Sequence, residues 1–203
     1  MGCCDDSACA IAQLQARQSR TLKWVLLINS VMFGVEFGAG LAAGSAALMA
    51  DSLDMLGDAL VYALSLYVVT RGVRWKAGAA LAKGLVMAGF GLFVLAQIAY
   101  RMFSAVPPEA ATMGAIGVLA LAANLVCLRL LTRHRDEDIN MRSVWLCSRN
   151  DIVANVSVLA AAGLVAVVHH PWPDWVVGLG IAALFLHSAG RVLGQARREL
   201  QAA

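Results

Sequence analysis

Apolar residues dominate six stretches of this chain, and short polar segments separate the stretches. A window of about 19 residues, the length used to detect membrane helices, identifies all of them. They span residues 22–43, 46–69, 77–103, 113–131, 143–168 and 175–193. Each is long enough to cross about 30 Å of hydrocarbon as an α-helix. The pattern predicts an all-α fold, a six-transmembrane-helix bundle.

The composition supports a polytopic membrane protein. Of the 203 residues, 60% are hydrophobic and 14% are charged, which is more apolar than a typical soluble domain. We expect a cytoplasmic Cys-containing tail at 1–21, one membrane domain at 22–193 and a short cytoplasmic tail at 194–203. The first residues are polar and lack the apolar core and cleavage site of a signal peptide. The five cysteines are an odd number, so a disulfide framework is not expected.

Basic residues orient the bundle. They cluster before span one, between spans two and three, between spans four and five, and after span six, whereas the alternate connections carry only Arg101. By the positive-inside rule, both termini are predicted to be cytoplasmic. The formal net charge of +3 is explained by this topology, so we expect the lipid bilayer, and no nucleic acid, as the partner of the basic residues.

The second span contains three aspartates, Asp51, Asp54 and Asp58. Each acidic side chain near a bilayer centre costs about 2.5–3.5 kcal/mol on insertion scales, so the three oppose insertion by roughly 8–10 kcal/mol unless they are partnered. Asp54 and Asp58 are four residues apart, and Asp51 shares their helix face. Asp51 lies nearer the outer end, where it serves an exit path or forms a local hydrogen bond. Ionisable residues retained in a membrane indicate a function.

A second polar stripe lies in span five, where Cys147, Asp151 and Asn155 are also spaced by four. Spans two and five run in opposite directions, and both polar stripes lie near mid-bilayer. If the two helices are neighbours, Asp54, Asp58, Cys147 and Asp151 converge as four metal ligands. Carboxylate oxygens and one thiolate suit Zn²⁺ or the softer Cd²⁺. For Asn155 we expect a hydrogen bond between helices first.

Other polar residues within the spans are expected to have structural roles. Asn29, Glu36 and Asn124 are candidates for hydrogen bonds between helices, and Glu36 is also a candidate for a proton path. Arg149 points away from the face that carries Cys147 and Asp151, and at membrane depth it needs an acidic partner that the sequence does not identify.

Two long segments resemble the cation diffusion facilitator family. The segment "VLLINSVMFGVEFGAGLAAGSAALMADSLDMLGDALVYALSL" is similar to the family's first two helices, and "DINMRSVWLCSRNDIVANVSVLAAAGLV" is similar to its approach to helix five. In that family an H/D-x-x-x-D pair on helix two and another on helix five form the metal site. The matching residues here are Asp54 and Asp58, then Cys147 and Asp151, with Cys where the family has His or Asp.

The resemblance implies a proton-coupled exporter of divalent cations, with Zn²⁺ or Cd²⁺ as the transported ion and protons as the counter-ion. It also implies a homodimer in the inner membrane of a bacterium. The family usually carries a ferredoxin-like cytoplasmic domain after helix six, and we expect a short form without it, dimerising through its spans. No catalytic residue and no resident cofactor is expected. Cys3, Cys4 and Cys9 either capture metal on the cytoplasmic side or have no function.

Two alternatives remain open. A membrane metal sensor or accessory binding protein would bind the ion without transporting it. The letters "DSLDMLGD" also fit the D-x-x-D-x-x-x-D pattern with which membrane prenyltransferases hold Mg²⁺ and a diphosphate. Those enzymes need a second aspartate-rich motif and more helices, so the enzyme is the weaker alternative.

Overall fold

The computed structural model describes residues 3–68, 73–104, 106–134 and 139–202, and these residues form α-helices joined by short turns and connections, with no strand among them. The six helices are α1 (Cys3–Ala43), α2 (Ala46–Val68), α3 (Val73–Ser104), α4 (Ala110–Thr132), α5 (Ile139–Val168) and α6 (Trp172–Ala202). The predicted fold class is therefore confirmed. Side chains are described for only part of these ranges, and the side chains of Cys147 and of the three N-terminal cysteines are outside that part.

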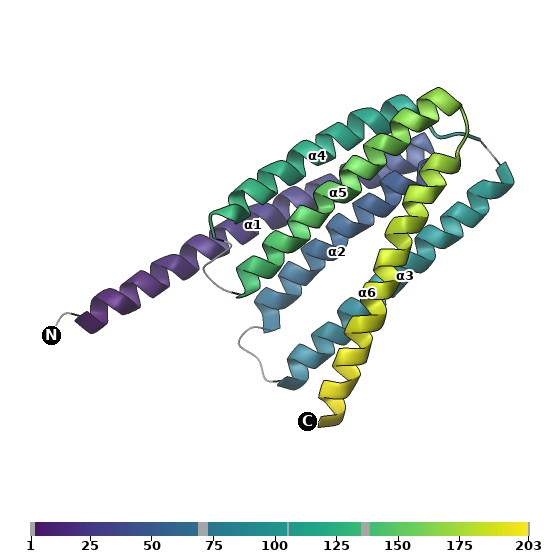
Figure 1. Ribbon diagram of the computed structural model, residues 1–203. Coiled ribbons are helices and arrows are strands. Elements are labelled where there is room, and N and C mark those ends of the chain that lie inside the picture. The colour runs from purple at the N-terminus through teal and green to yellow at the C-terminus, as the bar shows by residue number, and fades with distance from the viewer. Residues whose placement is uncertain (1–2, 69–72, 105, 135–138, 203) are drawn as a thin grey trace.

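The helices alternate in direction, and both chain termini lie at the same end of the bundle (Figure 1). Extensive contacts join α1 to α2, α4 to α5 and α3 to α6, and α1 also packs against α4. The second helix lies at the centre, because it contacts α1, α3, α5 and α6. The aspartates of α2 are thus carried on the helix that has the most neighbours in the bundle.

The boundary between α1 and α2 follows from two residues. Gly44 has a φ of +71°, a left-handed conformation that glycine adopts without steric strain and that ends α1. The next residue, Ser45, caps α2, because its Oγ accepts a hydrogen bond from the backbone N–H of Leu48 at 3.0 Å. At its other end α1 extends to Cys3, so the predicted tail is helical from that residue. No proline or glycine lies between Cys3 and the first apolar span to interrupt it.

Five helices contain segments that are long and apolar enough to cross a membrane, within the part of the chain that is described. The segments are Arg20–Ala43, Gly84–Phe103, Ala110–Thr132, Ser148–Val168 and Trp172–Gly194. Many large apolar side chains on them are exposed, such as Leu85, Val153 and Leu184, as expected of helices that face lipid. The chain is an integral membrane protein. The remaining helix, α2, carries the three aspartates and is surrounded by apolar neighbours.

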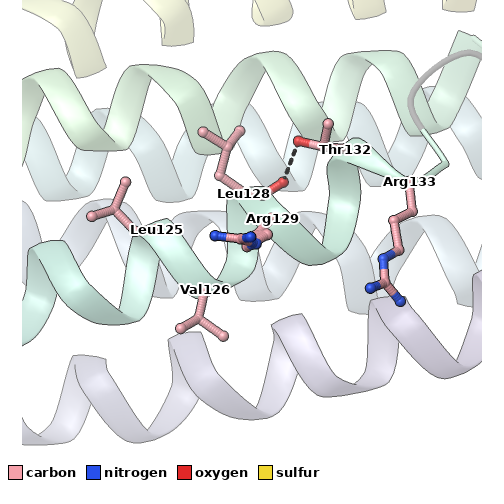
Figure 2. Close-up of a pocket in the computed structure, with 6 residues that line it drawn as sticks. All are labelled: Leu125, Val126, Leu128, Arg129, Thr132 and Arg133. Atoms are coloured by element: carbon pink, nitrogen blue, oxygen red, sulfur yellow. Dashed lines mark hydrogen bonds between the residues drawn. The ribbon is translucent and has the colours of Figure 1, made fainter.

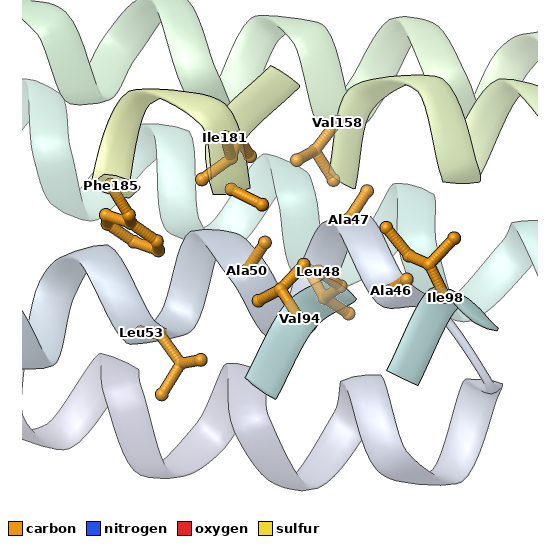
Figure 3. Close-up of a cluster of buried hydrophobic side chains, with 11 residues drawn as sticks. Ala46, Ala47, Leu48, Ala50, Leu53, Val94, Ile98, Val158, Ile181 and Phe185 are labelled. Carbon is orange, nitrogen blue, oxygen red and sulfur yellow. The ribbon is translucent and has the colours of Figure 1, made fainter. Parts of the chain in front are cut away.

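The largest buried cluster lies where α2, α3, α5 and α6 meet (Figure 3). It consists of Ala46, Ala47, Leu48, Ala50, Leu53, Val94, Ile98, Val158, Ile181, Ala182 and Phe185. Small residues allow the backbones to approach here. A Cβ added to Gly91 of α3 would lie 2.8 Å from the Leu186 side chain of α6. Close packing of this kind holds α3 and α6 together as a pair.

A buried carboxylate links the start of α6 to the start of α2. Asp174 is fully buried, and it accepts hydrogen bonds from the Ser45 hydroxyl at 2.5 Å and from the backbone N–H groups of Ala46 at 2.8 Å and Ala47 at 3.1 Å. A helix N-terminus presents unpaired N–H groups and a positive dipole end, both of which favour a carboxylate. The cap of α2 is therefore shared between its own Ser45 and a residue of α6.

Candidate metal centre

The three aspartates of α2 differ in burial. Asp51 is 1% exposed, whereas Asp54 and Asp58 are half-buried. The helical repeat places all three on one face of α2, and this face is turned toward the interior of the bundle. Asp51 lies nearest the α1–α2 turn, and Asp58 lies farthest from it, about 10 Å along the helix axis at 1.5 Å per residue.

The facing stripe on α5 meets this face directly. Asn155 is fully buried, and its Nδ2 donates to the backbone oxygen of Asp151 at 2.8 Å and to Oδ1 of Asp51 at 3.4 Å. The second of these hydrogen bonds connects α5 to α2. Asn155 therefore makes the hydrogen bond between helices that the sequence predicted for it. The two helices are neighbours, which is the condition that the predicted ligand set requires.

The contact between Asn155 and Asp51 sets the register of the two antiparallel helices. Because the helices are antiparallel, a step toward the N-terminus of α5 matches an equal step toward the C-terminus of α2. Asp151, four residues before Asn155, therefore lies level with Met55, four residues after Asp51. By the same count the backbone of Cys147 lies level with Ala59. The two predicted pairs therefore occupy the same layer of the bundle, between the depths of Asp54 and Ala59.

The acidic groups of this layer interact with one another. The carboxyl group of Asp151, which is half-buried, interacts electrostatically with those of Asp58, Asp54 and Asp51. Like charges in a low-dielectric interior repel, and a bound cation or proton relieves that repulsion. Among the described side chains, no three His, Cys, Asp or Glu groups already form a metal cage. Cys147, the fourth predicted ligand, has a side chain outside the described part.

A second thiol lies close to this layer and was not among the predicted site residues. Cys127 of α4 is buried and interacts electrostatically with Asp151 and Asp58. Its Sγ lies 4.0 Å from Oδ1 of Asn29 on α1. The available signal in the sequence was weak, because Cys127 stands three residues after Asn124 in a predominantly apolar span. Four helices, α1, α2, α4 and α5, thus contribute polar atoms to the centre of the bundle.

Arg149 has an aromatic partner where an acidic one was expected. Its guanidinium carbon lies 5.5 Å from the centre of the Trp145 ring, which is the geometry of a cation–π interaction. Trp145 in turn donates from Nε1 to the Thr132 hydroxyl at 3.1 Å, which ties α5 to α4. Arg149 is exposed and does not face the acidic layer.

A shallow hollow on α4 is separate from the acidic layer. It is lined by Leu125, Val126, Leu128, Arg129, Thr132 and Arg133 (Figure 2). All six belong to α4, and the Thr132 hydroxyl is satisfied within the helix by the Leu128 oxygen at 2.7 Å. None of the predicted ligands lines this hollow.

Comparison with known proteins agrees with the resemblance predicted from the motifs. Residues 22–201 match the family model of the cation efflux transmembrane domain. The chain is 26% identical to the metal cation efflux system protein CzcD of Cupriavidus metallidurans over 167 residues, 76% of this chain and 53% of the relative. It is 26% identical to the zinc transporter ZitB of Pectobacterium atrosepticum over 199 residues, 92% of this chain and 62% of the relative.

A third relative, the zinc transporter ZitB of Escherichia coli, is 26% identical over 200 residues, which are 90% of this chain and 62% of the relative. The chain thus spans between about half and three fifths of the length of these proteins. The family match includes the apolar part of α1 from residue 22, all of α2 to α5 and α6 as far as residue 201. With its acidic layer between α2 and α5, this chain belongs to the cation efflux transmembrane domain family, the cation diffusion facilitators.

Proposed function

We propose that the chain transports a divalent heavy-metal ion, Zn²⁺ or Cd²⁺, out of the cytoplasm in exchange for protons. The ion binds at Asp54, Asp58, Cys147 and Asp151. The observation that carries this proposal is the hydrogen bond between Asn155 and Asp51, because it sets the register that brings the two ligand pairs to one depth. Family membership and the relatives named CzcD and ZitB support a metal ion as the substrate.

The chemistry of the four groups supports exchange with protons. Aspartate and cysteine bind a metal ion in their deprotonated forms, so binding releases protons and protonation releases the metal. A divalent cation would also offset the repulsion within the acidic layer. Helices α3 and α6 form one packed group, and helices α1, α2, α4 and α5 form another. Rocking of one group against the other would expose the layer to each side in turn, as in other transporters.

The same proposal includes an orientation and an assembly. Helices α4 and α6 both end at the end of the bundle that holds the chain termini (Figure 1). The exposed Arg129, Arg133, Arg197 and Arg198 lie in or next to the last turns of these two helices. The positive-inside rule then places this end in the cytoplasm. The bacterial relatives support an inner membrane location. We further propose a homodimer whose contacts include the lipid-facing sides of the spans.

Flux measurements test the proposal. Proteoliposomes with an acidic lumen, diluted into neutral buffer that contains radioactive Zn²⁺ or Cd²⁺, are expected to accumulate the ion as protons leave. Collapse of the pH gradient with nigericin should abolish the accumulation, and protein-free liposomes serve as the control. Binding that saturates in proportion to protein, with no ion in the lumen, would contradict transport and favour the sensor or accessory protein. Family membership already favours transport over the prenyltransferase-like enzyme.

Replacement of the thiolate is expected to change metal preference. A thiolate is a soft ligand that favours Cd²⁺, whereas imidazole suits Zn²⁺. Cys147→His should therefore shift the ratio of Zn²⁺ to Cd²⁺ transport toward Zn²⁺ by roughly tenfold. The measurement is competitive uptake of the two ions into the same vesicles, with Cys127→Ser as the matched thiol variant. An unchanged ratio in Cys147→His would show that Cys147 is not a ligand.

A further inference from the structure

A second set of oxygen atoms lies beside the acidic layer, toward the end of the bundle opposite the termini. It comprises Glu36 of α1, Asp51 of α2 and Asn155 of α5. Their exposed fractions are 0%, 1% and 0%. Fully buried carboxylates are rare unless they are paired or bind a cation, so this set requires a physical explanation of its own.

Packing between α1 and α2 places Glu36 at the depth of the aspartates. A Cβ added to Gly40 would lie 2.7 Å from the Met49 side chain, so these residues are level on two antiparallel helices. Glu36, four residues before Gly40, is therefore level with Leu53, four residues after Met49. This depth lies between those of Asp51 and Asp54. Glu36 and Asp51 also interact electrostatically, and the Asn155 amide lies 3.4 Å from Asp51.

Four side-chain oxygens of this set lack hydrogen-bond partners. Both carboxylate oxygens of Glu36, Oδ2 of Asp51 and Oδ1 of Asn155 are buried without a partner in the described part of the chain. A buried polar atom left without a partner costs about 1–3 kcal/mol, and more when it is charged. Four such oxygens from three helices therefore need a donor or a cation. No described arginine or lysine donates a hydrogen bond to any of these four oxygens.

We propose that Glu36, Asp51 and Asn155 form a second cation-binding station, one helical turn beyond the centre formed by Asp54, Asp58, Cys147 and Asp151. The station takes the divalent ion of the proposed transport on its way out, so it depends on the proposed function for its role. Its ligands are oxygens alone, which hold soft ions less strongly than a site with a thiolate. A soft ion that moves from the centre to this station is thus closer to release.

Binding of Mn²⁺ tests the station directly, since Mn²⁺ prefers oxygen ligands and is observed by electron paramagnetic resonance. The protein is placed in nanodiscs with the centre disabled by Asp58→Asn and Asp151→Asn. Weak Mn²⁺ binding is expected to remain, and adding Glu36→Gln or Asp51→Asn should weaken it by roughly tenfold or more. Glu109→Gln, at an exposed carboxyl at the start of α4, is the matched control and should leave it unchanged. Binding that Glu36→Gln does not affect would overturn the station.

Exchange of metal ions across the membrane at equal pH on both sides distinguishes two roles of Glu36, binding of the metal ion and transfer of protons. If Glu36 binds the metal ion in transit, Glu36→Gln should slow Zn²⁺ counterflow by roughly tenfold even without a pH gradient. Normal counterflow with loss of only the pH dependence would overturn the proposal, because Glu36 would then carry protons. If the unmodified protein moves no metal at all, the proposed function fails, and the Mn²⁺ titration alone decides whether the station exists.

Discussion

Asp58→Asn is expected to reduce Zn²⁺ and Cd²⁺ transport by at least roughly a hundredfold. The change keeps the size of the side chain and removes one negative charge from the layer in which Asp58 interacts with Asp151. In the proposed site the interaction that is lost is that of the metal ion with the Asp58 carboxylate. Loss of one partner from a buried pair of opposite charges costs about 3 kcal/mol, and each 1.4 kcal/mol is about a factor of ten in affinity. The loss should appear in the initial rate of uptake driven by a pH gradient.

Controls distinguish the loss of a ligand from the loss of the fold. Glu109→Gln removes an exposed carboxyl group at the start of α4 and should leave the rate within about twofold of the unmodified protein, as surface substitutions usually do. Asp58→Asn should elute as a single species in detergent with its helical content retained. A variant that is folded and transports at half the normal rate or more would remove Asp58 from the site.

Asp174→Ala is expected to lower the free energy of unfolding by about 3 kcal/mol, because it leaves buried donors without an acceptor. The donors are the Ser45 hydroxyl and the N–H groups of Ala46 and Ala47, all in the cap of α2. The loss also detaches the start of α6 from the start of α2, next to the largest buried cluster. Unfolding in mixed detergent micelles, followed by circular dichroism, measures the change.

Asp174→Asn is the matched variant, since its amide oxygen still accepts hydrogen bonds. It should lose less than half as much stability as Asp174→Ala. A double-mutant cycle with Ser45→Ala isolates the contribution of the Ser45 hydroxyl, and we expect a coupling of about 1 kcal/mol for that hydrogen bond. A loss below about 0.5 kcal/mol in Asp174→Ala, the range of surface changes, would contradict the role of Asp174 as the cap of α2.

Much of the candidate centre could be predicted from residue spacing. Asp54 and Asp58 are four apart, as are Cys147 and Asp151, and that interval places each pair on one helix face whatever the rest of the chain does. The charges also stand out, since an apolar span carries them only at a free-energy cost. That Asp54, Asp58, Cys147 and Asp151 hold one metal ion stays a prediction, because the Cys147 side chain is outside the described part of the structure.

Other features of the centre could not be predicted, because they depend on contacts between helices. Cys127 and Glu36 lie on other helices than the aspartates, so no interval along their own helices relates them to Asp51, Asp54, Asp58 or Asp151. Their positions follow from the packing of α4 and α1 around α2. Arg149 was expected to need an acidic partner, and the Trp145 ring one turn before it on α5 serves instead.

The sequence by itself determined the elements of this protein: six helices, the turn at Gly44 and Ser45, and the faces on which the acidic residues lie. These properties are local, since they depend on runs of apolar residues, on the glycine and serine that separate the first two runs, and on the helical repeat. Only the tertiary structure decided which helices are neighbours. Spans that face lipid are apolar on the lipid side as well as on the packed side, so their composition does not indicate which faces pack. Those faces are identified by close contacts such as Gly91 with Leu186 and Asp174 with Ser45.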